Sequence, residues 1–401
     1  MSWPASRLTR WAGGNRRRSR SPLTGNQREG PAAVTHRPSA QPPGRPLRIA
    51  MVVPPWLSVP PPGYGGLEQV VHGLVDTLVG RGHTVTLFGA GRHHGTAADF
   101  VSTVPELQYD RLGESLPELA HLARVNHLVT PADFDIIHDH TTIGPLVAGR
   151  RAVPTVATVH GNPVGEYGTV LSDTDHGVGL VAISHAQRRA NPGLPWVGTV
   201  HNAMDAGDVP RKHAPGRGPV LWLARFSPDK GPELAIRACR AAGLPLTLAG
   251  KCNEPAERRY LAEVVEPMLD DDVAVVLNAD REATLRLLVD ARCLIMPIRW
   301  EEPFGMVMVE AMATGTPVVA LRRGAVPELV VEGRTGLIRD RAEELPAALR
   351  EAARLDPAAC VAHVAENFST ERMAAGYEEV YRRFAAGTAE PALRPAPAAV
   401  R

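Results

Sequence analysis

The sequence predicts an α/β protein of two doubly wound domains, and three observations support this fold class. Short apolar runs of strand length alternate with segments whose apolar residues follow helical spacing. The runs are continuously apolar, as in parallel strands that are covered on both faces. A polar stretch rich in proline and glycine, residues 205–218, divides them into two similar series. Two sheets, each flanked by helices and joined by this linker, are therefore expected.

Length and composition agree with this prediction. The chain has 401 residues, enough for two domains, and its 44% hydrophobic and 22% charged residues are typical of a soluble globular enzyme. The net charge of +1 conceals an asymmetry, because residues 1–45 carry nine Arg and one Glu and so sum to +8, which leaves −7 for the rest. No run approaches the roughly 18 apolar residues of a membrane-spanning helix.

The basic segment 1–45 is rich in Pro, Ser and Gly and predicts a disordered tail. It lacks the apolar run of about 7–15 residues of a secretory signal, so we expect a cytoplasmic protein. Its charge could contact an anionic membrane or a nucleic acid. A solvated tail or a misassigned translation start is the simpler explanation. We expect no nucleic-acid partner and leave peripheral contact with the inner membrane face open.

The first domain is expected over residues 46–204. It opens with the apolar strand 47–53, which a loop rich in Pro and Gly connects to a helix. That helix ends at Gly80 and Gly82, and its apolar side chains have helical spacing; they are Leu67, Val70, Val71, Leu74, Val75 and Leu78. The further strands are expected at 83–90, 134–140, 153–160, 179–184 and 196–202.

The second domain is expected over residues 219–367. Its strands are expected at 219–226, 244–250, 273–278, 293–298, 317–321 and 336–338. An amphipathic helix follows at 368–385, and a disordered tail is expected over 386–401. The four cysteines, Cys239, Cys252, Cys293 and Cys360, lie far apart without metal-ligand spacing, which suits reduced thiols. Cys239 and Cys293 have apolar neighbours and are expected in the core.

Residues 299–320, RWEEPFGMVMVEAMATGTPVVA, carry the strongest functional signal. They place Glu302 on a strand-to-helix loop and Glu310 eight positions later, inside a helix that Gly315 and Pro317 end. Helix N-termini offer unpaired N–H groups and a partial positive charge. Carboxylates there can accept hydrogen bonds from a polyol while the backbone binds an anion, although acidic residues at a helix start are often only dipole partners.

The spacing of these two glutamates resembles the E-x7-E signature of retaining glycosyltransferases of family 4, which have the GT-B fold. Three further segments match that family in the expected order: GYGGLEQVV (63–71), LARFSPDKG (223–231) and GAVPELV (324–330). The resemblance covers roughly residues 47 to 385. It implies two Rossmann-like domains that face each other across a cleft, with the helix 368–385 packing back on the first domain.

Two cations at a strand end, Arg225 and Lys230, suit a diphosphate, because Arg binds it bidentately and Lys acts as a point charge. The alternative is a solvated pair of surface charges. The resemblance implies that both stabilise the nucleoside diphosphate leaving group, on which charge develops during transfer.

The glycines of GYGGLE stand where a dinucleotide-binding loop would. The G-x-G-x-x-G fingerprint fails, however, because Glu68 occupies the third glycine position, and this disfavours an NAD-dependent oxidoreductase. The resemblance implies instead that Gly65 and Gly66 allow close approach of the backbone to donor phosphate and acceptor. A plain tight turn before a helix is the alternative.

His160 ends the strand 153–160, where the resemblance implies a histidine that points into the cleft near the donor. A structural hydrogen-bonding role is the alternative. His138 and His140 have metal-like spacing and should point the same way from one strand, but no third ligand is evident. We expect no metal and no cofactor, since GT-B enzymes do not generally depend on one.

The resemblance also assigns roles around the two glutamates. Glu310 should accept hydrogen bonds from donor ribose hydroxyls, and Glu302 should contact sugar hydroxyls, with backbone N–H groups near Phe304 and Gly305. Glu328 belongs to a cleft-facing loop. Asn202 stands in H-N-A-M-D where the family usually has N-G-V-D, which puts its interdomain contact in doubt.

The sequence therefore predicts a retaining glycosyltransferase. It should move a sugar from a nucleoside diphosphate donor to an acceptor hydroxyl by front-face displacement. The alternatives are a GT-B sugar-nucleotide epimerase or phosphorylase, or a non-catalytic nucleotide-sugar-binding protein. The base, the sugar and the acceptor (a lipid, a polysaccharide or a small metabolite) are not determined.

Overall fold

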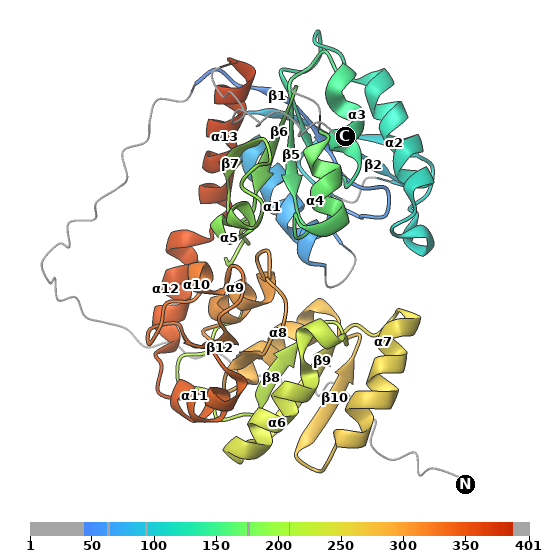
Figure 1. Ribbon diagram of the computed structural model, residues 1–401. Helices are drawn as coiled ribbons and strands as arrows, with labels where there is room; N and C mark the ends of the chain where they lie inside the picture. The colour runs from blue at the N-terminus through green and yellow to red at the C-terminus, as the bar shows by residue number, and fades with distance from the viewer. Residues whose placement is uncertain (1–43, 62–64, 93–94, 175–176, 208, 388–401) are drawn as a thin grey trace, which may run out of the picture. The chain divides into compact units, whose positions relative to one another are not determined.

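The computed structural model describes residues 44–61, 65–92, 95–174, 177–207 and 209–387 (Figure 1). Almost all of the two predicted disordered tails, 1–45 and 386–401, therefore lies outside the described residues. Among the described helices none is both long enough and apolar enough to cross a membrane.

The N-terminal sheet has, within the described residues, seven parallel strands in the order β3-β2-β1-β4-β5-β6-β7. The inner strands β1, β4, β5 and β6 are buried almost throughout, which explains why they appear in the sequence as unbroken apolar runs. The strands are β1 (Arg48–Val52), β2 (Thr84–Ala90), β3 (Asp99–Val104), β4 (Ile136–Asp139), β5 (Thr155–Val159), β6 (Val178–Ala182) and β7 (Trp196–Thr199). The helices are α1 (Gly66–Gly80), α2 (Ser115–Leu128), α3 (Gly144–Val147), α4 (Gly165–Ser172) and α5 (His185–Ala190).

The C-terminal sheet repeats this topology, with six described parallel strands in the order β10-β9-β8-β11-β12-β13. They are β8 (Val220–Leu223), β9 (Leu246–Gly250), β10 (Val273–Leu277), β11 (Leu294–Met296), β12 (Val318–Leu321) and β13 (Gly336–Arg339). The helices are α6 (Pro232–Ala242), α7 (Pro255–Tyr260), α8 (Arg281–Asp290), α9 (Met306–Ala313), α10 (Val326–Leu329), α11 (Leu345–Ala352), α12 (Pro357–Asn367) and α13 (Thr370–Ala385). The predicted α/β fold class of two doubly wound domains is thereby confirmed.

Strand β3 was not predicted, and its composition explains why. It is the outermost strand of its sheet and pairs only with β2 among the described strands. Of its residues only Thr103 is buried, so it lacks the apolar run that marks the inner strands. An edge strand with one paired side can be polar, which hides it from a search for apolar runs.

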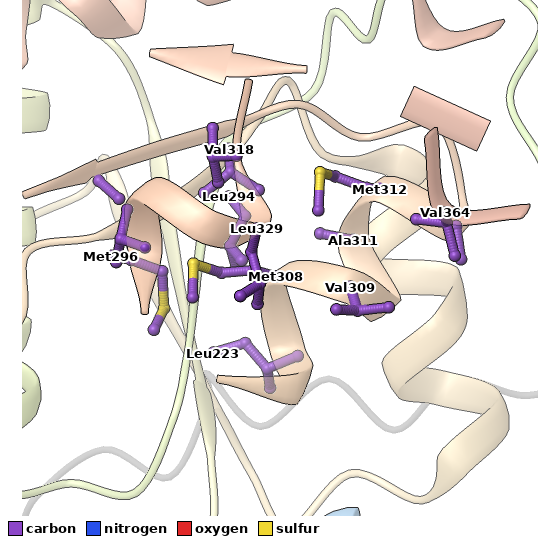
Figure 2. Close-up of a cluster of buried hydrophobic side chains, with 14 of the residues drawn as sticks. Leu223, Leu294, Met296, Met308, Val309, Ala311, Met312, Val318, Leu329 and Val364 are labelled. Atoms are coloured by element: carbon purple, nitrogen blue, oxygen red, sulfur yellow. The ribbon is translucent and has the colours of Figure 1, made fainter. Parts of the chain in front are cut away.

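Helix α9 is buried from Met308 to Ala313, which fits its almost wholly apolar sequence. Figure 2 shows Met308 and Met312 among residues of the sheet and the neighbouring helices, including Leu294, Val318 and Val364. A helix packed this tightly gives the loop before it, which carries Glu302, a fixed support. All four cysteines are free and buried, as expected for Cys239 and Cys293.

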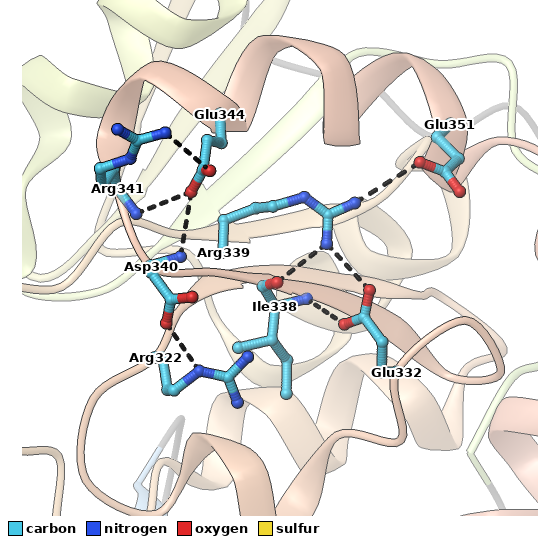
Figure 3. Close-up of polar contacts among 8 residues, drawn as sticks. All are labelled: Arg322, Glu332, Ile338, Arg339, Asp340, Arg341, Glu344 and Glu351. Atoms are coloured by element: carbon cyan, nitrogen blue, oxygen red, sulfur yellow. Dashed lines mark hydrogen bonds and ion pairs between the residues drawn. The ribbon is translucent and has the colours of Figure 1, made fainter.

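Hydrogen bonds and ion pairs hold the carboxyl end of β13 in place. Glu332 accepts a hydrogen bond from the backbone of Ile338 and pairs with Arg339, which also reaches Glu351 on α11 (Figure 3). Asp340, just after the strand, pairs with Arg322. These ion pairs lie at the surface, so they orient the strand end more than they stabilise it.

The last helix, α13, contacts α1 and β7 of the N-terminal sheet although it follows the C-terminal one in sequence. Its buried side chains Met373, Tyr377 and Tyr381 belong to the same core as Ile49 and Leu74. The amphipathic pattern of 368–385 thus has its apolar face on the first sheet. Residues 205–207 and 209–218 contain no helix or strand, and the predicted domain boundaries themselves stay predictions.

Candidate active site

Both sheets have a point at which consecutive strands separate, between β1 and β4 and between β8 and β11. The loops at the carboxyl ends of the strands diverge there and leave a crevice in which ligands of this fold class bind. His160 follows β5, Arg225 follows β8 and Glu302 follows β11. The predicted site residues therefore come from the carboxyl ends of the strands around these points.

A cavity of about 290 Å³ lies at the carboxyl edge of the C-terminal sheet. Three cations line it, which are Arg225, Lys230 and Lys251, together with the carboxylate of Glu302 and the backbone of Gly305. Its other lining residues are Leu223, Ala224, Gly250, Met296, Met306 and Val307. Net positive charge beside a helix start gives this cavity the character of an anion site.

Two residues, Glu302 and Trp300, hold the side chain of Lys230 in place. Its Nζ lies 2.7 Å from Glu302 Oε2 and 4.4 Å from the centroid of the Trp300 ring, a cation–π arrangement. The indole N–H of Trp300 donates to the same Glu302 oxygen at 3.0 Å. Lys230 and Glu302 are mostly buried, with side-chain exposures of 12% and 10%, so the pair is a fixed element of the cavity wall.

Arg225 is more open. Its side chain is 53% exposed and its guanidinium lies 3.4 Å from Glu257, a long contact that leaves most of its donors facing solvent or the cavity. Lys251, just after β9, was missed by the sequence analysis. A single lysine after a strand has the pattern of an ordinary surface residue, so the sequence carries no signal for it.

Gly305 caps the start of α9 with φ of +91°, a left-handed conformation that favours glycine. A Cβ there would lie 2.5 Å from Met308 Cε and 3.2 Å from Glu302 Cγ. The turn that aims the first N–H groups of α9 at the cavity therefore needs a glycine. Phe304, before it, has a buried side chain that packs with His201 and Phe368, so only its backbone is available to a ligand.

Glu310 lies in the second turn of α9 and is 4% exposed. It does not line the 290 Å³ cavity, whereas Glu302 does. The structure thus separates the two glutamates of the signature: Glu302 forms part of the cavity wall, and Glu310 lies deeper in the helix.

A smaller cavity of about 170 Å³ joins residues of both domains. Gly66, His160 and Asn202 line it from the N-terminal domain, and Glu302 and Gly305 line it from the C-terminal domain. Asn202 is buried, and its Oδ1 has no hydrogen-bond partner in the described part of the chain. A buried, unpaired amide oxygen that lines a cavity can accept a hydrogen bond from a ligand hydroxyl.

Gly65 caps α1 and Gly66 is its first residue. A Cβ on Gly66 would meet no atom within 4 Å, while one on Gly65 would meet only the side chain of Glu68. A side chain at either position would therefore not clash with the backbone or with another element of the fold. Space for a ligand near the start of α1 is consistent with the predicted close approach.

His160 donates or accepts through Nε2, which lies 2.9 Å from Nδ1 of His140. Burial lowers the pKa of His138, His140 and His160 well below the ordinary value, so all three are neutral near pH 7. The sequence placed His138 and His140 on the same side of their strand, and their rings lie 4.0 Å apart. It did not show that His160 joins them.

Glu328, on α10, connects to the N-terminal domain rather than to either cavity. It accepts hydrogen bonds from the backbone N–H groups of His185 and Ala186 and pairs with His201 at 3.0 Å. His185, His201 and Glu328 have the composition of a metal site, with ligand atoms within 4.8 Å of one another. Because Glu328 already accepts these three hydrogen bonds, we assign it as an interdomain clamp.

Taken together, the two cavities can bind an anion beside a hydroxylated group. The cations and the start of α9 suit a phosphate or diphosphate, and Glu302, Asn202 and His160 suit hydroxyls. Such a pair of neighbouring subsites fits a nucleotide sugar.

Comparison with known proteins agrees with this geometry. A family model described as glycosyl transferases group 1 matches residues 210–359, and one described as glycosyltransferase family 4 matches residues 64–176. Among curated proteins, a glycogen synthase of Mycobacterium tuberculosis is 26% identical over 345 residues, covering 73% of this chain and 82% of the relative. A phosphatidyl-myo-inositol mannosyltransferase of Mycolicibacterium smegmatis is 26% identical over 76% of this chain and 84% of its own.

Solved structures show the same architecture. AviGT4, a glycosyltransferase involved in avilamycin A biosynthesis, is 26% identical, with a TM-score of 0.64 over 85% of this chain and 99% of that one. Anabaena HepE, crystallised with UDP and glucose, is 19% identical, with a TM-score of 0.62 over 84% of this chain and 99% of that one, and shows the fold alone.

Proposed function

Because this chain belongs to the GT-B glycosyltransferases of the family 4 type, we propose that it transfers a sugar from a nucleoside diphosphate donor to an acceptor hydroxyl, with retention of anomeric configuration. The observation that carries the proposal is the 290 Å³ cavity, in which three cations and the start of α9 lie beside Glu302. Positive charge fixed at this point stabilises the phosphate from which the sugar departs.

The proposed roles follow the geometry. Arg225 and Lys230 bind the diphosphate, and the backbone N–H groups after Phe304 and Gly305 assist them. Glu302 orients the sugar. Glu310 holds the ribose hydroxyls, although it lies deeper than the cavity wall in this structure. His160, Gly65 and Gly66 approach from the first domain, and closure of the two domains brings them to the donor.

Retention by front-face displacement is supported by the scarcity of nucleophiles. Glu302 is the single carboxylate among the described residues that line the two cavities, and its Oε2 is engaged by Lys230 and Trp300. A carboxylate held in this way is a poor covalent nucleophile. The leaving phosphate then accepts the proton of the acceptor hydroxyl as the new glycosidic bond forms on the same face. No metal or cofactor enters this proposal.

The test is thermal stabilisation by UDP-, GDP-, ADP- and TDP-sugars. A ligand at 100 times its dissociation constant stabilises the native state by about 2.7 kcal/mol. One donor should raise the melting temperature of the wild type and of Arg240→Ala, whose arginine pairs with Asp270 on the surface, but not of Arg225→Ala. The bound donor is then used to screen acceptors. Absence of any shift at millimolar donor, or turnover without an acceptor alcohol, contradicts the proposal.

A further inference from the structure

Three histidines meet at the carboxyl ends of β4 and β5: His138 and His140 are buried, and His160 is partly exposed. The rings of His138 and His140 lie 4.0 Å apart, and those of His140 and His160 lie 5.2 Å apart, nearly parallel. Of the three, His160 lines the cavity that Glu302 and Gly305 share. The contacts of His140 therefore influence which ring nitrogen of His160, a residue of the proposed donor site, carries the proton.

His140 is hydrogen-bonded at both ring nitrogens. Its Nδ1 lies 2.9 Å from His160 Nε2, and its Nε2 lies 3.1 Å from the thioether sulfur of Met51. Met51 belongs to β1 and is fully buried, and His140 is 3% exposed. Within the described residues, these two contacts are the hydrogen bonds of the His140 ring, while its backbone N–H donates to the carbonyl oxygen of Val52.

The methionine decides which nitrogen carries the proton. A thioether sulfur has no hydrogen to donate and acts only as a weak acceptor. A neutral imidazole has one N–H, so the contact is favourable when His140 carries its hydrogen on Nε2 and donates to Met51. Its Nδ1 is then unprotonated and accepts from His160, which must carry its own hydrogen on Nε2.

We propose that Met51 and His140 act as positioning residues that fix the tautomer of His160, so that His160 Nδ1 presents a lone pair to the cavity and recognises a ligand hydroxyl. His160 Nδ1 has no hydrogen-bond partner in the described part of the chain. An unprotonated nitrogen accepts from a hydroxyl but repels a phosphate oxygen, which is itself an acceptor. The opposite tautomer would donate to phosphate.

The consequence for the donor rests on the proposed function. With the diphosphate bound by Arg225, Lys230 and Lys251, His160 is left to select the sugar by one of its hydroxyls. The tautomer itself does not depend on that function, because it follows from contacts in the ligand-free protein.

The direct test is nitrogen NMR of the full chain labelled with ¹⁵N-histidine, without ligand. Correlations from the ring protons identify which nitrogen of each histidine is protonated, and the His160→Asn spectrum assigns the His160 signals by their loss. The wild type should show His160 protonated on Nε2 and unprotonated on Nδ1. Protonation on Nδ1 overturns the proposal.

Met51→Leu keeps the size of the side chain and removes the acceptor. The two possible arrangements of protons on the rings of His140 and His160 then become closer in free energy. His160 signals should shift toward the Nδ1-protonated form, and kcat/KM with the donor found by the thermal assay should fall about 2- to 10-fold, the equivalent of one neutral hydrogen bond. Met373→Leu, a buried methionine of the same core, is the matched control and should change neither.

A second pair separates hydrogen bonding from packing. In His140→Asn the amide oxygen can take the place of Nδ1 and accept from His160, so tautomer and kcat/KM should be largely retained. In His140→Leu both should change. Equal behaviour of the two variants, or a shifted tautomer with unchanged kcat/KM, overturns the positioning role. The expected tautomer in a chain that turns over no donor contradicts the proposed transfer reaction instead.

Discussion

At the scale of single residues, the donor cavity depends on charges that hold one another in place. Lys230 lies between the carboxylate of Glu302 and the face of Trp300, and Trp300 also donates a hydrogen bond to Glu302. None of the three side chains can therefore move alone without losing a contact with the others. Such preorganisation lets a cation act on a leaving group without reorganising during the reaction. The ion pair of Lys230 and Glu302 serves function more than stability, because the desolvation cost of burying two charges offsets much of their attraction.

We expect Lys230→Met to lose at least as much activity as Arg225→Ala, because it removes a leaving-group cation and also frees Glu302. Loss of one charge-assisted hydrogen bond costs about 1.5–3 kcal/mol, which is roughly a 10- to 150-fold fall in kcat. Initial rates at saturating donor measure it. Lys230→Arg is the control, and full activity of the Met variant would remove Lys230 from the leaving-group site.

Glu310→Ala should abolish turnover while the protein stays folded, since the proposed role of this carboxylate is to hold the ribose. Glu310→Gln keeps the shape of the buried side chain and should lose donor affinity without losing the fold. Circular dichroism reports the fold, and the donor thermal shift reports binding. Wild-type turnover in the Ala variant would contradict the assignment.

At the scale of elements, a glycine turn at Gly305 sets the direction in which α9 begins. The start of α9 needs a residue that tolerates positive φ and has no side chain, because its neighbours Met308 and Glu302 occupy the space. A small change here moves the start of α9 together with the loop that carries Glu302.

Gly305→Ala should destabilise the protein and abolish the donor thermal shift. Gly333→Ala is the matched control: its φ of +70° carries similar backbone strain, but a Cβ there would meet nothing within 4 Å. Both should lower the free energy of unfolding by about 1 kcal/mol or more, measured in urea. Equal donor shifts in the two variants would show that α9 does not bind the donor through this turn.

An ion pair between Asp135 and Arg48, at the amino ends of β4 and β1, makes the free energy of unfolding depend on pH. Asp135 accepts hydrogen bonds from the Arg48 side chain and backbone and pairs with Arg45, and the Arg48 side chain is the main cause that lowers the pKa of Asp135 to about 2. A lowered carboxyl pKa stabilises the fold above the unfolded value of about 3.9, and this contribution is lost as pH falls toward 2.

Asp135→Asn should therefore unfold at lower urea concentration than the wild type at pH 6. The difference should shrink between pH 4 and pH 2, as the wild-type carboxylate takes up its proton. Urea midpoints at pH 6, 4 and 3 test this, and a difference that is constant over that range would exclude the ion pair as its source.

At the scale of the whole molecule, the last helix returns to the first sheet. Tyr381 donates or accepts a hydrogen bond with His138 Nδ1 at 2.7 Å, and Tyr377 contacts Thr158 at 2.8 Å, with all four groups buried. Helix α13 thus ties the C-terminal end of the chain to the strands that carry the histidines.

Tyr381→Phe should lower the free energy of unfolding by about 1–3 kcal/mol, because it leaves His138 Nδ1 buried without a partner. Tyr109→Phe, at a ring that is 50% exposed, should change it by less than about 0.5 kcal/mol. Urea unfolding followed by fluorescence measures both. A neutral Tyr381→Phe would mean that α13 packs on the first sheet by its apolar face alone.

The sequence by itself determined the two doubly wound domains and the strand-to-helix turn before α9, because buried parallel strands and glycine turns leave local patterns in the chain. It did not show strand β3, whose single paired edge needs no apolar run. Nor did it show Lys251 in the cavity, Glu328 as a clamp, or Met51 and His140 behind His160. Those contacts join residues far apart in the chain, so only tertiary packing, which sets distances between separate strands, decided them.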